Sequence, residues 1–392
     1  MRKIFILCCV FLYSCASTTQ SHLDNVQRHF ANADFNISET DATKDSNLDL
    51  LIDGVAFFHA NEFEQSDLFF EEFNKRNLHE TSSSITRETA GLLLGQGVNS
   101  YKPYMMDSLF VSYYQIWDLL ALQDWSNARV VINQSYARQQ NMSIEYKKLI
   151  EENKNKISEN AQYREIMDKN TADWVAFSDI MNPALMYLSG IYFLNDGDFD
   201  NAILYLKRAN GMMPENTFIK QDLQLAEQRI KPTNTTWQFI ETGFAPRLHE
   251  QNTGLFLPTI GMVYFSFSEP YFNDNFNTPQ NAQMLADVDA MFITEYKEYR
   301  TNEILRSFTS AVSKATLQGT MYNSHSDSAP ILGILSSIYT VASSNTDVRT
   351  WATLPKYIYV IRQSAKQNEK NNLIYIRENN GKITDEKTIK LK

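Results

Sequence analysis

Residues 182–216, "NPALMYLSGIYFLNDGDFDNAILYLKRANGMMPEN", constrain the fold of this chain more than any other stretch. Small and large apolar residues recur there at the spacing of two antiparallel helices joined by a short turn: Gly190, Phe193, Ala202, Leu206, Ala209 and Pro214. Gly190 and Ala202 allow a close approach, and the large residues fill the seam. Asp198 is placed as the N-cap of the second helix, and Pro214 ends that helix.

This spacing resembles the tetratricopeptide repeat, a helix–turn–helix unit of about 34 residues. Two weaker copies cover residues 53–73 and 113–135, with matching residues Gly54, Phe57, Ser66, Phe70 and Phe73 in one and Ile116, Leu119, Ala128, Ile132 and Ser135 in the other. Equivalent positions fall at 54, 116 and 190, too far apart for a continuous array. We therefore expect an α-helical, tetratricopeptide-like domain over 47–232 with additional helices, or else generic antiparallel helix packing.

The pattern changes after Pro232. Aromatic and β-branched stretches there indicate strands, separated by two apolar helical stretches. The expected order is strands in 235–244 and 259–267, a helix over 286–318, a smaller apolar helix over about 329–343, a strand at 356–363 and a hairpin over 372–391 turning at Asn380-Gly381. The predicted fold class is α+β, with an α+β domain over 233–392.

The first residues indicate export. Arg2 and Lys3 precede an apolar run, Ile4–Tyr13, which is too short to span a bilayer but has the length of a signal-peptide core. "LYSC" (12–15) resembles the lipobox of bacterial lipoproteins, which implies a signal peptide over 1–14, cleavage before Cys15 and acyl chains such as palmitate on that residue. An ordinary secretory signal is the alternative.

The cysteines and the residues after the lipobox support this interpretation. All three cysteines lie within the first fifteen residues, so the rest of the chain has neither a disulfide framework nor thiol chemistry. Ala16 follows Cys15 instead of Asp, which resembles lipoproteins sent to the outer membrane. We expect a lipidated flexible tether over 15–46, with or without one short helical stretch, and a periplasm-facing body.

Composition excludes some partners. The chain has 36 basic and 46 acidic residues, and loss of Arg2 and Lys3 with the signal peptide makes it more acidic still. Nucleic acid and anionic lipid bind clustered Lys and Arg, so neither is an expected partner. The sequence holds no nucleophile elbow, Ser-x-x-Lys pair or Walker loop, and no two of its six histidines stand at i,i+4. No metal, no cofactor and no catalytic residue is predicted.

Two sets of residues are candidates for binding. In helix–turn–helix units of this type the first helix lines the concave face, which gives a predicted partner-binding groove of Phe58, His59, Tyr113, Trp117, Tyr187 and Asn195. Aromatic residues at helical spacing are also what a core uses. In "DVRTWATLP" (347–355), Asp347, Arg349 and Trp351 would share one face of an extended segment and bind a carboxylate or glycan, or would pin a loop through an ion pair and a stacked indole.

A third set lies on the long C-terminal helix. It consists of acidic and basic side chains in close sequence: Asp287, Asp289, Glu295, Lys297, Arg306 and Lys314. Such a cluster can perform acid–base chemistry, but acids near a helix start also complement the helix dipole, and we expect structural pairing.

Several stretches together resemble a family of tetratricopeptide-like lipoproteins of gammaproteobacteria that has no established activity. The resemblance rests on the lipobox, "NPALMYLSGIYFLNDGDFDNA", "ETGFAP", "ADVDAM…EYK…ILRSFTSAVSKATLQ" and "DVRTWATLP". Members are often encoded beside a lipoprotein that resembles the activators of penicillin-binding proteins, which implies work in the cell envelope and a partner in cell-wall synthesis.

These observations predict a non-enzymatic, membrane-anchored periplasmic lipoprotein that acts as a protein-binding scaffold, with an envelope protein held by its helical repeats. The alternative is an envelope glycan-binding protein or hydrolase that uses the C-terminal domain. A subunit of a larger assembly, self-associating through 329–343, is a third possibility.

Overall fold

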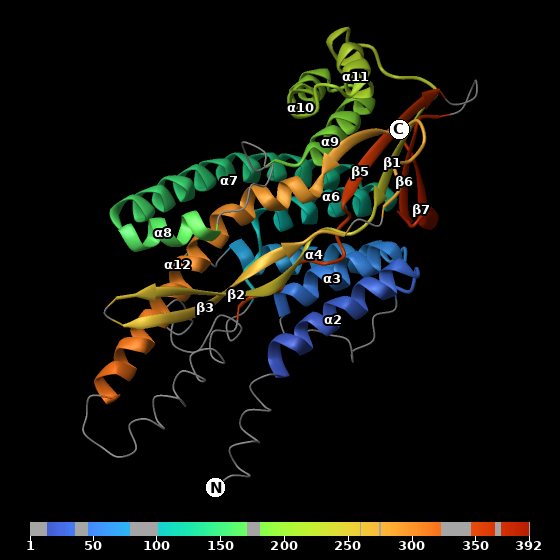
Figure 1. Cartoon of the computed structure of the whole chain (residues 1–392). Helices are drawn as coiled ribbons and strands as arrows, with labels where there is room; N and C mark the ends of the chain where they lie inside the picture. The colour runs from blue at the N-terminus through green and yellow to red at the C-terminus, as the bar shows by residue number, and fades with distance from the viewer. Residues whose placement is uncertain are drawn as a thin grey trace.

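The computed structural model describes residues 14–35, 46–78, 101–170, 181–258, 260–273, 276–322, 346–364 and 370–391. Its fold is mixed α+β, with helices in the N-terminal part and a β-sheet in the C-terminal part (Figure 1). The helices before the sheet are α2 (Ser14–Ala31), α3 (Ser46–His59), α4 (Phe63–Leu78), α6 (Met105–Ala121), α7 (Trp125–Glu159), α8 (Ala161–Asn170), α9 (Pro183–Asp196), α10 (Phe199–Met212) and α11 (Thr217–Glu227).

Three helix pairs, α3/α4, α6/α7 and α9/α10, lie where the sequence pattern places helix–turn–helix units. The glycines permit the close approach that their spacing indicates. A Cβ on Gly54 would lie 2.6 Å from the Phe70 ring, and one on Gly190 would lie 2.7 Å from the Leu206 side chain. In the third pair, Gly197 ends α9 with a left-handed backbone (φ 87°), and the Asp198 side chain accepts from the backbone N–H of Asn201. The predicted turn and N-cap are confirmed.

The C-terminal part contains a five-stranded sheet, a separate hairpin and one long helix. The sheet has the order β4-β5-β1-β6-β7, from β1 (Thr235–Thr242), β4 (Gln283–Asp287), β5 (Tyr357–Ser364), β6 (Asn372–Asn379) and β7 (Lys382–Lys390). Strand β1 is antiparallel to β5 and parallel to β6, and the other neighbours are antiparallel. The hairpin pairs β2 (Arg247–Leu257) with β3 (Gly261–Tyr271), and α12 (Val288–Tyr322) packs along it.

The predicted C-terminal hairpin is confirmed. Asn380 and Gly381 connect β6 to β7 with φ values of 50° and 78°, the two positive angles that a type I′ turn requires. Strands β2 and β4 were not predicted. Pro246 and Pro258 flank β2, and Pro270 lies inside β3, on the two-stranded hairpin where edge positions tolerate proline.

One hydrophobic core joins the helices to the sheet. It contains Leu23 of α2, Trp117 of α6, Tyr187 of α9 and Tyr375 of β6, together with Leu391 near the C-terminus. The helical and α+β parts therefore share their interior, although each contributes its own secondary structure.

The predicted flexible tether is wrong for residues 15–35, because these residues form most of α2 and its end. Leu23, Val26 and Phe30 are buried in the core, and the Gln27 side chain donates to the carbonyl of Ala352 at 2.7 Å. The spacing i, i+3 and i+7 makes one apolar face on an otherwise polar helix. Residues 1–13 of the predicted signal peptide, 36–45 of the tether and the predicted helix 329–343 lie outside the described residues.

Candidate functional site

The predicted partner-binding groove is filled by the chain's own sheet. Its six residues Phe58, His59, Tyr113, Trp117, Tyr187 and Asn195 are each at most 5% exposed. They do lie on the first helices of the three pairs, as predicted, and those helices face the sheet (Figure 1). The prediction of a partner protein in this groove is wrong, because the chain's own sheet covers that face of the helices.

Aromatic contacts make this interface. The Trp117 ring lies 5.4 Å from that of Phe239 and 5.5 Å from that of Tyr375, edge to face in both cases. Phe58 meets Tyr375 at 4.9 Å, and Tyr187 meets Phe239 at 5.8 Å. Since β1 and β6 are neighbours with Phe239 opposite Tyr375, the two strands present one aromatic surface to α3, α6 and α9.

Glu241 of β1 forms the first of two buried polar centres in this interface. Its carboxylate accepts from the hydroxyls of Tyr114 (3.0 Å) and Tyr375 (2.7 Å) and from the Arg377 guanidinium (3.2 Å). Arg377 also donates to the Gly243 carbonyl at 2.6 Å. Burial raises the pKa of Glu241, while Arg377 and the tyrosines lower it. A buried carboxylate with this many donors specifies how the helices sit on the sheet.

Asp222 of α11 forms the second centre. It accepts from the Tyr187 hydroxyl at 2.6 Å, from the Trp237 indole N–H at 2.7 Å and from Arg362 Nε at 2.7 Å. The three donors come from α9, β1 and β5, so one carboxylate joins four elements. Asn195, the last predicted groove residue, accepts from the Asn371 amide at 2.7 Å and likewise joins α9 to the start of β6.

His59 has a structural role at the end of α3. Its Nδ1 lies 2.8 Å from Asp385 Oδ2, and Lys387 donates to the same aspartate and to the Asn61 side chain. Burial lowers the pKa of His59 to about 4, despite the neighbouring carboxylate. The imidazole is therefore neutral at pH 7 and holds the α3–α4 turn against β7.

The "DVRTW" residues do not share one face. Arg349 binds Asp347 with two parallel hydrogen bonds, of 2.8 Å from Nε and 2.7 Å from Nη2. Trp351 is buried and points into the core, where its ring lies 6.2 Å from those of Phe70 and Tyr114. The geometry fits the alternative in which an ion pair and an indole fix a loop on the body.

The acids of the third set separate into individual structural contacts, and Asp287 ends β4 instead of lying on the long helix. Asp287 accepts from the N–H of Ala290 at 2.9 Å, Asp289 pairs with Lys356, and Glu295 accepts from the backbone N–H groups of Met105 and Met106 at the start of α6. Burial raises the pKa of Glu295 to about 8. The remaining predicted residues of this set, Lys297, Arg306 and Lys314, lie further along α12.

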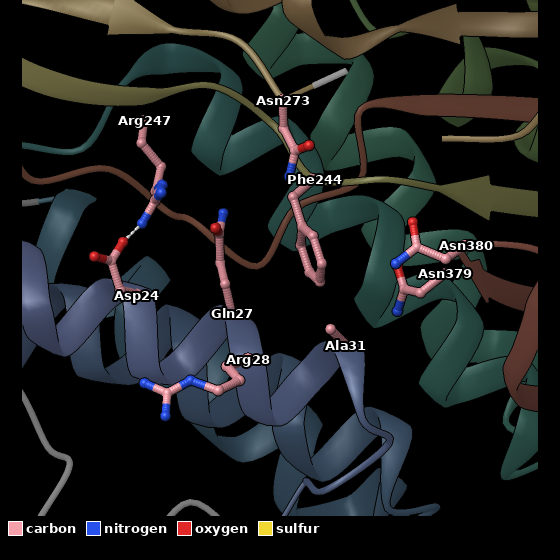
Figure 2. A pocket seen from close by; sticks show the side chains of 9 residues that line it. All are labelled: Asp24, Gln27, Arg28, Ala31, Phe244, Arg247, Asn273, Asn379 and Asn380. Atoms are coloured by element: carbon pink, nitrogen blue, oxygen red, sulfur yellow. Dashed lines mark ion pairs between the residues drawn. The ribbon is translucent and has the colours of Figure 1, made fainter. Parts of the chain in front are cut away.

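A polar pocket of about 330 Å³ lies where α2 crosses the ends of the strands (Figure 2). Six of its residues come from five separate segments: Gln27 and Arg28 from α2, Phe244 after β1, Arg247 at the start of β2, Asn273 after β3 and Asn379 at the end of β6. Asp24, Ala31 and Asn380 complete the lining. The Phe244 ring forms the apolar part of the wall, and the other side chains surround it (Figure 2).

Side-chain amides dominate this pocket. Gln27, Asn273, Asn379 and Asn380 each carry a side-chain amide, and those of Gln27 and Asn379 also donate to the carbonyls of Ala352 and Phe30. Asn379 is 5% exposed; its Nδ2 donates to the Phe30 carbonyl at 3.5 Å, and its Oδ1 has no hydrogen-bond partner among the described residues.

The charges of the pocket nearly balance. Asp24 and Arg247 form an ion pair across the pocket's rim, drawn as a dashed line in Figure 2. Burial lowers the pKa of Arg247. Arg28 is exposed and adds a further positive charge. A mixture of amides, one aromatic ring and paired charges suits a neutral or weakly acidic polar ligand better than a highly charged one.

No residue of this pocket was predicted from the sequence as a binding residue. Asn380 was predicted only as part of the hairpin turn, and the residues of α2 only as part of the signal peptide and tether. The usable signal was the apolar stripe Leu23, Val26 and Phe30, which predicts a packed helix and would have placed the residues of α2 against the body.

The described residues contain no group of three or more His, Cys, Asp or Glu side chains arranged to hold a metal ion. Within the same residues, every helix is too short or too polar to cross a membrane. Comparisons with protein-family models, with curated proteins and with solved structures give no match.

Proposed function

We propose that this chain is a lipid-anchored protein of the cell envelope, without enzymatic activity, whose ligand site is the polar pocket between α2 and the sheet. Cleavage before Cys15 and acylation of that residue are inferred from "LYSC" and from the absence of any later cysteine. Ala16 supports the outer membrane as the destination, with the body facing the periplasm.

The helix pairs are proposed to be tetratricopeptide-like units that serve as a scaffold for the chain's own sheet. The support is the equivalent role of Gly54 and Gly190, each facing a large side chain of the second helix of its pair. Because the sheet covers the first helices, any partner of this protein binds elsewhere than at Trp117 or Tyr187.

The pocket is proposed to bind a glycan segment, as expected of an envelope glycan-binding protein. The observation that carries this assignment is the lining of four side-chain amides beside Phe244. Sugar hydroxyls donate and accept at once, as side-chain amides do, and the C–H face of a sugar ring packs on an aromatic ring. The volume of about 330 Å³ lies at the lower end of the range for small-ligand sites and suits one or two sugar residues.

Calorimetric titration with soluble fragments of the cell-wall glycan tests this function. Wild type is expected to bind, and Asn273→Ala and Arg28→Ala are each expected to weaken binding by about tenfold, the cost of one or two lost hydrogen bonds. Arg76→Ala, at an exposed arginine of α4 far along the chain from every pocket residue, is the matched control and should bind like wild type. Absence of binding by wild type, or equal binding by all variants, would reject the glycan assignment.

A protein partner is the second candidate, favoured by one further observation. A hollow of about 430 Å³ lies between the edge strand β7 and the turns of two helix pairs, lined by Asn61, Phe63, Ala121, Gln123, Lys387, Thr388, Ile389 and Lys390. An edge strand offers unpaired backbone groups to an extended peptide. The test is crosslinking of this protein to a partner in cells. Loss of the crosslink with Thr388→Pro but not with Trp117→Phe would favour this candidate, and loss with neither would reject it.

A further inference from the structure

The hairpin β2–β3 carries an apolar surface on each of its two faces. One face is buried: Leu255, Leu257, Val263 and Phe265 pack on α12 and α8, and the Phe265 ring lies 5.7 Å from that of Phe308. The opposite face holds Phe256, Met262 and Tyr264, which are 62%, 49% and 55% exposed. The second surface is therefore not needed for the fold of the hairpin.

The exposed residues form one continuous patch. Phe256 stands opposite Met262, and Gly254 stands opposite Tyr264 in the antiparallel register. The Met262 and Tyr264 side chains both approach Gly254, within 3.0 Å of where a Cβ would lie. Glycine thus lets the two side chains lie flat across the strand, and the three large residues form a single outward surface, called the hairpin patch below.

The sequence around the hairpin patch is free of charge. Residues 251–268, "QNTGLFLPTIGMVYFSFS", contain no Asp, Glu, Lys or Arg, in a chain where 21% of residues are charged. Soluble proteins ordinarily protect exposed hairpins with charges. Aromatic and Met side chains without charges suit the boundary between lipid headgroups and acyl chains, and they do so without requiring anionic lipid.

The anchored helix and the hairpin leave the body from one point of contact. Since α2 is helical from Ser14 and buried from Leu23, about 12 Å of rigid helix separates the acylated residue from the body. Asp24 of α2 contacts Arg247, the first residue of β2. From that contact the N-terminal half of α2 and the hairpin both extend away from the five-stranded sheet (Figure 1).

We infer that the hairpin patch rests on the surface of the membrane to which Cys15 anchors the chain, so that lipid and hairpin together fix the orientation of the body. This inference rests on the proposed lipid anchor. A short rigid connection holds the body near the bilayer, and an uncharged aromatic surface on the same side of the sheet then has a lipid surface as its neighbour.

The absence of cysteines after residue 15 permits a site-specific test. Met262→Cys is labelled with an environment-sensitive fluorophore, and the full mature protein is reconstituted into vesicles of phosphatidylcholine and phosphatidylethanolamine. Lipids that carry a nitroxide quencher are expected to quench this label at least about twofold more than a label at Ile144→Cys, an exposed position on α7. Treatment of the wild-type protein with the same thiol-reactive fluorophore reports whether Cys15 is blocked by acylation, because only a free thiol takes up the label.

Each outcome decides the inference. Equal quenching at 262 and 144 in protein that floats with the vesicles would overturn it while leaving the anchor intact. A fluorescence shift at 262 that depends on protein concentration, and not on vesicles, would assign the patch to a second copy of the chain and also overturn it. If wild type takes up label at Cys15, the anchor proposal fails, and the hairpin inference fails with it.

Discussion

The C-terminal sheet meets the helical part in two ways that differ in chemistry. Against α3, α6 and α9 the contact is closed: aromatic rings interlock, and the carboxylates of Glu241 and Asp222 have three donors each. Against α2 the contact is open and leaves an amide-lined pocket of about 330 Å³. Aromatic residues at helical spacing therefore predicted an interface correctly, but not that the chain's own sheet fills it. The accessible site is lined instead by asparagines, which form no recognisable pattern in the sequence.

The closed contact is most sensitive to the loss of a buried charge. Replacing Arg377→Met leaves the Glu241 carboxylate without its counter-ion inside the core, and we expect the free energy of unfolding to fall by about 3–5 kcal/mol. Urea unfolding measures the change. Arg229→Met, which removes an ion pair whose side chains are 61% and 78% exposed, should change the free energy by less than about 1 kcal/mol. Similar effects of the two substitutions would show that the Arg377 pair is not buried.

Close helix packing gives the next largest effect. Gly190→Ala places a methyl group 2.7 Å from Leu206 Cγ and Cδ2, so the third helix pair must move apart. We expect a net loss of about 1–2 kcal/mol, after the gain in helix propensity is subtracted. Gly211→Ala on α10 is the matched control, because nothing lies within 4 Å of its added Cβ, and it should leave stability unchanged or raise it by up to about 1 kcal/mol. Equal effects of both would contradict the helix-pair geometry.

The buried carboxyl groups predict a pH dependence. Burial raises the pKa of Asp107 to about 7 and those of Glu295 and Glu303 to about 8. The folded protein therefore binds more protons than the unfolded chain above the ordinary carboxyl pKa, and stability falls as pH rises toward 8. The pKa of His59 is lowered to about 4, so this residue makes stability increase with pH, but only between about pH 4 and 6.5.

Thermal unfolding between pH 6.5 and 8 isolates the carboxyl contribution. The melting temperature should decrease across this window, and Glu295→Gln should make the decrease shallower because one of the raised pKa values is removed. A melting temperature that is constant or increases from pH 6.5 to 8 would show that these groups are ionised in the folded protein.

The open contact should tolerate substitution with the smallest change in stability. Arg28 and Asn380 are exposed at the pocket, so Arg28→Ala and Asn380→Gly are each expected to change the free energy of unfolding by less than about 0.5 kcal/mol. Glycine is chosen at 380 because the backbone there has φ 50°. Urea unfolding beside the glycan titration separates stability from binding; a loss above about 2 kcal/mol would mean that this contact is as closed as the other.

Local features of the fold could be predicted from the sequence, and long-range ones could not. The α9/α10 pair, its Asp198 cap and the Asn380-Gly381 turn depend on residues a few positions apart, so their spacing is visible. That Trp117 packs between Phe239 and Tyr375 depends on residues more than 100 positions apart, and a groove lined by Tyr and Trp has the same pattern whether a partner or a sheet fills it.

The candidate site illustrates the same limit. Its lining combines α2 with the ends of strands that begin after residue 234, and no single segment of the sequence contributes enough of the pocket to form a motif. The apolar stripe of α2 was the one local signal, and the polar composition of residues 16–46 obscured it. A helix with three buried side chains in its second half is enough to bring the N-terminal segment onto the sheet.

A double-mutant cycle between Trp117 on α6 and Tyr375 on β6 tests most directly whether the helical face is filled by the chain's own sheet. Trp117→Leu, Tyr375→Leu and the double variant are compared with wild type by urea unfolding. An aromatic contact at 5.5 Å predicts a coupling energy of about 0.5–1.5 kcal/mol. Strictly additive effects, with coupling below about 0.3 kcal/mol, would contradict the closed contact and return the helical face to the role of a free groove.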